Sequence, residues 1–284
     1  MASLRDIKQR ISNVSSTEQI VKAMNMIAST KLHKARAQLE GVRPIYHHLS
    51  LLVDELGSYS RARSHVFFKE REVRNSLYII LTSDRGFSGG YNANIMAKAL
   101  EHMNQGKNEK ILVVGSKGSE FFKKREKNII RTITDVADAQ VYHGSESIAR
   151  WVVELYLSGE VDEVFVVYTQ FESLLNYVPK VDQLLPAAAS TEELNDDDRK
   201  FEPDILTYID HVIPFYLHMS LFRAFSESHT SEQAARMINM DAARKNAEEM
   251  IEELIRFYNR KRQAAITQEL SEIVGSADVL NTFE

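Results

Sequence analysis

The chain has 284 residues, of which 44% are hydrophobic and 26% charged, and it carries a net charge of −5 and no cysteine. This composition is typical of a globular protein with one large domain or two small ones. It excludes disulfides and Cys-based zinc sites, and no apolar run reaches the roughly 18 residues of a membrane span.

Helix-breaking residues are concentrated in the middle of the chain. Residues 1–40 contain neither glycine nor proline, and the 60 residues from Phe215 to Val274 contain neither. Nine of the 11 glycines lie between Gly57 and Gly159. Because glycine and proline are the strongest breakers of local structure, this distribution predicts a long helix at each end and a turn-rich domain between them.

The N-terminal segment is predicted to be a basic, amphipathic helix, since residues 1–43 carry eight Lys or Arg against three Asp or Glu. Apolar residues recur in steps of three and four, the pattern of a coiled-coil seam. The seam comprises Leu4, Ile7, Ile11, Val14, Val21, Ala28, Leu32, Ala35, Leu39 and Val42. Ile20, Met24 and Ile27 form a second stripe, which predicts another contact. Gly41 and Pro44 predict a bend, after which the helix resumes to about Glu55.

The middle of the chain alternates strand and helix patterns, which predicts βαβ units and a mostly parallel sheet. The predicted strands are Ser76–Thr82, Lys110–Val114, Ile129–Ile133 and Glu163–Thr169, with an edge strand at Tyr177–Leu185. The predicted helices are Tyr91–Met103, Lys117–Lys124 and Ile148–Leu157, the last capped by Ser145. A polar linker is expected over residues 187–203.

The C-terminal helix carries two apolar seams. The first consists of Ala243, Ala247, Met250, Leu254 and Phe257, and the second, in a shifted frame, of Ile266, Leu270, Ile273, Ala277 and Leu280. Between them lies Tyr258–Gln263, here called the basic belt, which contains Arg260, Lys261 and Arg262. The interruption predicts a point at which the helix meets charged groups of a partner.

One motif suggests an enzyme. Gly86–Gly90 reads Gly-Phe-Ser-Gly-Gly and lies between a predicted strand and a predicted helix, the setting of a hydrolase nucleophile. A serine hydrolase would combine Ser88 with Asp162 and either His211 or His218. Both histidines lie outside the strand–helix region, and a hydrolase has no use for long coiled coils. A glycine-rich turn without catalytic chemistry is therefore the favoured interpretation.

Nucleotide and nucleic-acid binding find little support in the sequence. The G-x-x-x-x-G-K-[ST], G-x-G-x-x-G and H-E-x-x-H patterns are absent, so no cofactor and no metal are expected. The basic N-terminal arm leaves open a coiled-coil scaffold that binds nucleic acid. The acidity of the whole chain argues against that partner.

Four blocks together resemble the gamma subunit of F-type ATP synthases of the bacterial type. They are Ser3–Ile11 with Thr17–Met24, the glycine-containing Thr82–Asn92, Ser231–Met237, and Tyr258–Leu270 followed by Glu272-Ile-Val. The order is that of the family, and the resemblance extends over the full chain. One departure is that the family's glycine motif often reads Gly-Leu-Cys-Gly-Gly, whereas this chain has Phe87 and Ser88.

The resemblance implies a non-catalytic rotor subunit. The expected fold is an α/β domain with a Rossmann-like, mostly parallel sheet at 75–195, plus an antiparallel coiled coil of two shaft helices at 1–57 and 205–284. The implied partners are a hexameric ring of alpha and beta subunits, the epsilon subunit and the membrane c-ring. Proton flow would turn the shaft and drive ATP synthesis on the beta subunits. The expected location is the cytoplasmic face of the cell membrane, without a direct membrane span.

The resemblance also implies three sets of contact residues. Contacts to the beta subunit, a catch that transmits torque, would be made by Arg260, Arg262, Gln263, Thr267 and Glu269, with Lys22 and Met24 nearby on the facing helix. An apolar bearing at the tip would consist of Ile273, Val274, Ala277 and Leu280. The foot facing the c-ring would include Phe201, Glu202 and Asp204.

Overall fold

A computed structural model describes residues 3–103, 108–136, 140–188 and 201–281, with the side chains of 275–281 left out. The contacts divide the chain into two compact units. Unit 1 consists of Met1–Ile27 with Met237–Glu284, and unit 2 is Ala28–Arg236. None of the helices in these ranges is long and apolar enough to cross a membrane.

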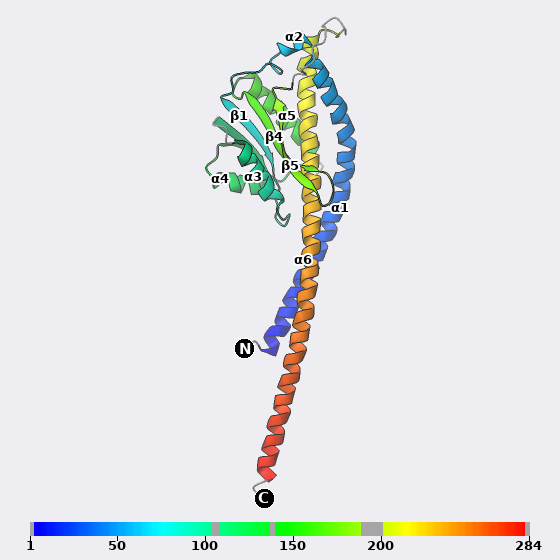
Figure 1. Cartoon of the computed structure of the whole chain (residues 1–284), viewed down its shortest axis with the longest axis vertical. Coiled ribbons are helices and arrows are strands. Elements are labelled where there is room, and N and C mark those ends of the chain that lie inside the picture. Colours follow the sequence, from blue (N-terminus) through cyan, green and yellow to red (C-terminus); the bar gives the residue numbers. More distant parts are fainter. Residues whose placement is uncertain (1–2, 104–107, 137–139, 189–200, 282–284) are drawn as a thin grey trace. The chain divides into compact units, whose positions relative to one another are not determined.

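Two long helices dominate the chain, as the distribution of glycine and proline predicts (Figure 1). Helix α1 spans Leu4–Leu56 and helix α6 spans Ile205–Asn281. Helix α1 begins with a capping box, in which the Asp6 amide donates to Ser3 Oγ and the Ser3 amide donates to Asp6 Oδ2. Helix α1 runs through Gly41 and Pro44 as one helix, so neither residue ends it, and the bend stays a prediction.

The α/β domain in unit 2 is built on a five-stranded sheet of order β3-β2-β1-β4-β5. The strands are β1 (Asn75–Leu81), β2 (Asn108–Val114), β3 (Ile129–Ile133), β4 (Glu163–Phe171) and β5 (Tyr177–Leu185). The pairs among β1 to β4 are parallel, and β5 pairs antiparallel with β4 at the edge. The predicted strands, the mostly parallel sheet and the edge position of Tyr177–Leu185 are confirmed.

Helices cover both faces of this sheet. Helices α3 (Tyr91–Met103) and α4 (Ser116–Lys123) lie on one face, where Ile95 and Phe122 pack with Tyr78 and Ile80. Helix α5 (Val141–Leu157) and α6 lie on the other face, and the short α2 (Ser60–Arg63) joins the same core. From β1 the strand order runs outward through β2 and β3, and it then resumes on the other side of β1 with β4. The point between β1 and β4 is therefore the topological switch point, where doubly wound folds bind ligands.

The predicted start of helix α5 is wrong. The sequence predicts that Ser145 caps a helix beginning at Ile148, but the helix begins at Val141 and Ser145 is buried inside it. Its hydroxyl donates to the Tyr142 carbonyl at 2.8 Å. His143 and Gly144 have low helix propensity, so the sequence does not indicate a helix there. Packing in the fold nevertheless stabilises this first turn of α5.

The seam predicted for α1 is confirmed over most of its length. Ile7, Ala28, Leu32, Ala35, Leu39 and Val42 are each at most 5% exposed. In unit 2, Arg43 bonds to Glu227 and Tyr46 stacks on Tyr216 with ring centroids 6.0 Å apart. Because α6 residue numbers fall as α1 numbers rise, the two helices run antiparallel, as expected.

Candidate functional site

The basic belt lies on an exposed stretch of α6 in unit 1. Among the residues that the structure describes, Arg260 and Arg262 are exposed and make no ion pair. Arginines elsewhere on the same helix are paired: Arg244 with Asp241 and Glu248, and Arg256 with Glu252. Gln263, Thr267 and Glu269 are also exposed. Arg260 and Arg262 thus leave their charged donors open to solvent.

Lys22 and Met24 do not lie beside the belt. The Asn25 side-chain amide donates to the Met237 carbonyl at 3.1 Å, which fixes the register of the two helices in unit 1. The belt is 23 residues beyond Met237 at Arg260, or about 35 Å along the helix. The expectation that Lys22 and Met24 lie near the belt is therefore wrong, because the antiparallel register places them elsewhere.

Lys22 and Met24 instead lie in a separate exposed region of α1. The second apolar stripe is open to solvent here, with Ile20 61% and Ile27 59% exposed, and Met24 is half-buried. Lys22 is exposed. Two stretches of unit 1, rather than one, are thus available to a partner.

The second apolar seam is not buried against α1. Asn25 lies beside Met237, and α1 begins 21 residues before Asn25, at Leu4. Because the helices are antiparallel, Leu4 lies at the level of about residue 258 of α6. Figure 1 shows α6 continuing past the N-terminus of α1. Ile266, Leu270, Ile273 and Val274 are accordingly between 48% and 64% exposed. The expectation of a coiled-coil seam here is wrong for this chain alone, whereas an apolar bearing surface agrees with the exposure. The side chains of Ala277 and Leu280 lie outside the described residues.

The expected foot residues have structural contacts of their own. Phe201 packs edge-on against Tyr59, with ring centroids 5.4 Å apart, and also contacts Tyr208. Asp204 caps α6, since Oδ1 accepts from the amides of Leu206 and Thr207. These bonds hold the pKa of the Asp204 carboxyl below its usual value, with the Thr207 hydroxyl as the largest cause. Glu202 and Asp204 are exposed, whereas Phe201 is partly buried.

The glycine motif does not form a hydrolase site. Ser88 is 2% exposed, and its hydroxyl accepts from the side-chain amide of Asn92 (Nδ2) at 3.3 Å. Ser88 follows the carboxyl end of β1, whereas Asp162 accepts from the amides of Arg74 and Asn75 at the other end, about 20 Å away along the strand. His218 bonds to the Tyr142 carbonyl on α5. The serine-hydrolase hypothesis is therefore wrong.

The amides that could bind a phosphate are already engaged. The β2–α4 turn reads Gly115-Ser-Lys-Gly-Ser, and a helix start after such a turn is a common anion site. Here the Ser116 amide donates to Asp84 Oδ1, the Lys117 amide to the Ser83 carbonyl and the Gly118 amide to Thr82 Oγ1. The Asp84 carboxylate takes the place that a phosphate would occupy.

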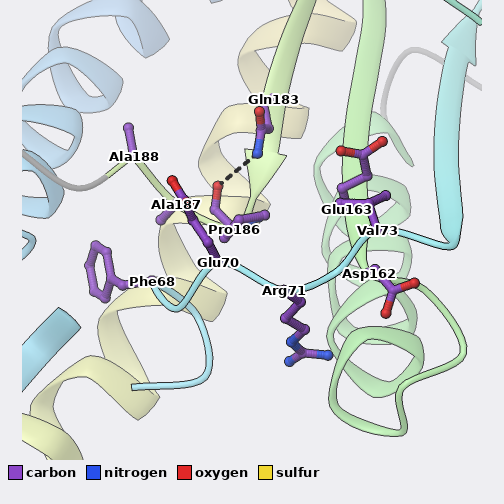
Figure 2. Close-up of a pocket in the computed structure, with 10 residues that line it drawn as sticks. All are labelled: Phe68, Glu70, Arg71, Val73, Asp162, Glu163, Gln183, Pro186, Ala187 and Ala188. Atoms are coloured by element: carbon purple, nitrogen blue, oxygen red, sulfur yellow. Dashed lines mark hydrogen bonds between the residues drawn. The ribbon is translucent and has the colours of Figure 1, made fainter. Parts of the chain in front are cut away.

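A pocket of about 470 Å³ lies at the opposite, amino-terminal end of the strands (Figure 2). Its walls carry Glu70, Asp162 and Glu163 together with Arg71. Asp162 accepts two backbone amides, Glu163 accepts the Ser76 hydroxyl at 2.5 Å, and Arg71 stacks on Tyr156. Asp162, Glu163 and Arg71 therefore already have partners within the domain.

Sequence reasoning missed a buried polar stretch of α6. Arg223, Glu227, Ser228 and Ser231 are each at most 8% exposed, although they lie in the middle of a long helix. Glu227 pairs with Arg43 of α1 and also accepts the Phe171 amide of β4 at 2.8 Å. The signal that could have indicated this is the run of small polar residues at 226–231, which is unusual in a coiled-coil helix.

We expect Arg43→Met to lower the free energy of unfolding by about 3 kcal/mol, because it leaves the Glu227 carboxylate buried without a countercharge. The Glu227 side chain is 2% exposed, so solvent cannot replace the guanidinium. Chemical denaturation of the purified chain measures the change. The double variant Arg43→Met with Glu227→Gln removes the unpaired charge and should recover part of the loss. A single variant as stable as the wild type would contradict this account.

These features describe a class of protein: an α/β domain in which the described amides of the β2–α4 turn are already bonded, joined to two long antiparallel helices that expose charged and apolar side chains. The family model described as ATP synthase matches residues 3–280. The ATP synthase gamma chain of Moorella thermoacetica is 40% identical over 281 residues, covering 99% of this chain and 100% of that protein. The gamma chain of Desulforamulus reducens is 39% identical over 282 residues, with 99% and 100% coverage. The chain belongs to the ATP synthase gamma chain family.

Solved structures share the fold at low sequence identity. A chain of the Euglena gracilis mitochondrial ATP synthase, in its OSCP/F1/c-ring assembly, superposes with a TM-score of 0.70 at 19% identity, covering 98% of this chain and 94% of that one. A chain of the Tetrahymena thermophila central stalk and c-ring superposes with a TM-score of 0.62 at 23% identity, covering 79% and 99%. The expected fold class, long terminal helices with a central α/β domain, is confirmed.

Proposed function

We propose that this chain is the rotating shaft of an F-type ATP synthase, with no catalytic site of its own. Its full-length membership of the gamma chain family is the observation that carries the proposal. The proposed parts are shaft helices at 1–57 and 205–284 and an α/β domain at 75–195. The proposed partners are the ring of alpha and beta subunits, the epsilon subunit and the c-ring, which would hold the chain at the cytoplasmic face of the membrane.

Exposed charge on the shaft supports a torque-bearing contact. Arg260, Arg262 and Gln263 present donors that their own chain does not use, and charge-assisted hydrogen bonds to carboxylates of a beta subunit are the strong contacts that such donors make. Thr267 and Glu269 extend the same contact. Lys22 and Met24 form a second contact about 35 Å away. Two separated contacts resist rotation of the ring relative to the shaft better than one.

The apolar end of α6 supports a bearing. Ile273 and Val274 are 64% and 60% exposed, and apolar side chains form no directional bonds that would hold one angle. Ala277 and Leu280 continue the same surface in the sequence. At the start of α6, Glu202 and Asp204 are the exposed side chains proposed for contact with the c-ring, and Phe201 packs beneath them against Tyr59.

Coupling in this scheme is allosteric. The angle of the shaft changes the relative free energies of open and closed beta sites, so its contacts must differ between those states. We propose protons as the coupling ion. A relative from Acetobacterium woodii, 36% identical over 299 residues, is described as sodium ion specific. The ion therefore needs a direct test, in which ATP-driven transport is followed with and without sodium.

Native purification tests the proposal. An affinity-tagged chain is expressed from its own chromosomal locus, and the complex is extracted from membranes with mild detergent. We expect recovery of the alpha, beta, epsilon and c subunits with ATPase activity. Recovery of the chain without alpha and beta subunits would refute the proposed function.

A further inference from the structure

The ligand crevice of the α/β domain is occupied by helix α6. In doubly wound folds this crevice lies beyond the carboxyl ends of the strands at the switch point, here β1 and β4. Strand β4 pairs with β1 only over Val164–Val167 and the preceding residue, so its last four residues extend past β1. That extension leaves one edge of the β4 backbone without a strand partner.

Side chains of the long helices complete this edge. The Thr169 amide donates to Ser228 Oγ at 3.0 Å, and Ser231 Oγ donates to the Thr169 carbonyl at 3.2 Å. Two residues further along β4, the Phe171 amide donates to the Glu227 carboxylate, and the Arg43 guanidinium of α1 donates to the Phe171 carbonyl at 2.5 Å. The side chains thus imitate the bonds of a neighbouring strand.

A second set of contacts lies one turn earlier on α6. Arg223 donates to Tyr168 Oη and to Asp182 Oδ2, both at 2.8 Å, and so connects α6 to β4 and β5. Its guanidinium also lies over the ring of Tyr46 on α1, at 4.2 Å. Burial opposes its charge, yet Tyr168, Tyr46 and Asp182 keep the pKa of Arg223 above its ordinary value. The cation therefore stays charged within the interface.

We propose that this crevice has become a mechanical joint, through which torque passes between the α/β domain and the two shaft helices. Arg223, Glu227, Ser228 and Ser231 of α6 and Arg43 of α1 are its positioning residues. The bonds are directional and buried, so they resist sliding of the helix over the sheet in a way that apolar packing does not. The same side chains fill the crevice, so it takes no nucleotide. The inference rests on the proposed rotor function.

The chain offers a matched control for testing the joint. Ser228 and Ser231 bond to strand β4, whereas the equally buried Ser220 and Ser226 bond only to carbonyls of their own helix, Tyr216 and Phe222. Replacing either pair by alanine removes two hydroxyls from the same helix. Loss of one buried hydrogen bond shifts an equilibrium by about fivefold. Only the first pair, Ser228→Ala with Ser231→Ala, should favour the state in which the end of β4 has separated from α6.

The test uses the complete complex in lipid vesicles, where ATP hydrolysis and ATP-driven ion uptake are measured against increasing opposing ion gradients. Ser228→Ala with Ser231→Ala removes two such bonds, so we expect the ratio of uptake to hydrolysis under high load to fall about 25-fold, with a normal ratio at zero load. Ser220→Ala with Ser226→Ala should keep the wild-type ratio at every load. A purely structural role would change the amount of complex and not this load dependence.

Equal load dependence in both double variants overturns the joint while leaving the rotor function intact. If the first double variant does not assemble, Ser228→Ala is compared with Ser226→Ala, and the same criterion applies. Hydrogen exchange of the full-length chain gives an independent measurement, because the amides of Thr169 and Phe171 should exchange faster only in the joint variants. The proposed function itself would be refuted by a different result, namely purification of the wild-type chain without alpha and beta subunits.

Discussion

ATP-driven ion pumping is expected to fall about tenfold when Arg262 and Gln263 are both replaced by alanine, while the chain stays folded. A charge-assisted hydrogen bond contributes about 1.5 kcal/mol or more, and 1.4 kcal/mol corresponds to a factor of ten. Both side chains are exposed on α6, so the substitution should change the free energy of unfolding by less than about 0.5 kcal/mol. Pumping by reconstituted complexes and thermal melting of the chain measure the two effects.

Arg256→Ala is the control for this prediction. Arg256 is exposed on the same helix, but its guanidinium bonds to Glu252 at 3.1 Å within the chain. Its loss removes a positive charge without removing a donor that a partner needs. Normal pumping by the Arg262→Ala, Gln263→Ala variant, or an equal defect in Arg256→Ala, would contradict the assignment of the catch.

Gly115→Ala is expected to destabilise the α/β domain by about 4 kcal/mol or more. Gly115 adopts φ +97, and a Cβ there would lie 2.3 Å from the Thr82 carbonyl oxygen, which belongs to the backbone and cannot rotate away. The same turn carries the amides that bind Asp84 and Thr82. The change would therefore separate the β1 and β2 loops, and circular dichroism during urea unfolding would detect it.

Substitutions at two further glycines separate the two causes of the destabilisation, which are backbone strain and the steric clash of the added Cβ. Gly159 also has a positive φ, +77, but an added Cβ meets nothing within 4 Å, so Gly159→Ala reports backbone strain alone, about 1 kcal/mol. Gly41 lies inside α1 with open space around it, and Gly41→Ala should stabilise the helix by about 0.5–1 kcal/mol. If Gly115→Ala cost no more than Gly159→Ala, the steric explanation would be wrong.

The sequence predicts the elements well because periodicity and helix breakers are local signals. Strands β3 and β5 and helix α3 match their predicted bounds, and the seam is buried at Ile7 and from Ala28 to Val42. Pro44 does not end α1, because its missing amide costs one bond in a helix that tertiary packing holds on both sides. The start of α5 fails for the same reason, since packing overrides weak local propensity.

Properties that depend on register could not be predicted from one sequence. Heptad spacing shows that α1 and α6 have seams, but not which residues lie opposite each other, and the family resemblance wrongly implies that Lys22 and Met24 lie near the belt. The bond from Asn25 to Met237 corrects this. The joint could not be predicted from the sequence either. Ser228 and Glu227 bond to backbone amides of β4 that are free only because β4 extends past the end of β1.

The unequal reach of the two helices has a consequence for assembly. Beyond about residue 258, α6 has no α1 beside it, and its apolar side chains stay exposed. An unsupported helix of this length is marginally stable in water, so we expect the last turns to open and close rapidly in the free chain. In the proposed rotor, such an end could be threaded into a preformed ring of alpha and beta subunits. Apolar burial inside the ring would hold the segment helical, so we expect the tip to complete its folding as it is inserted.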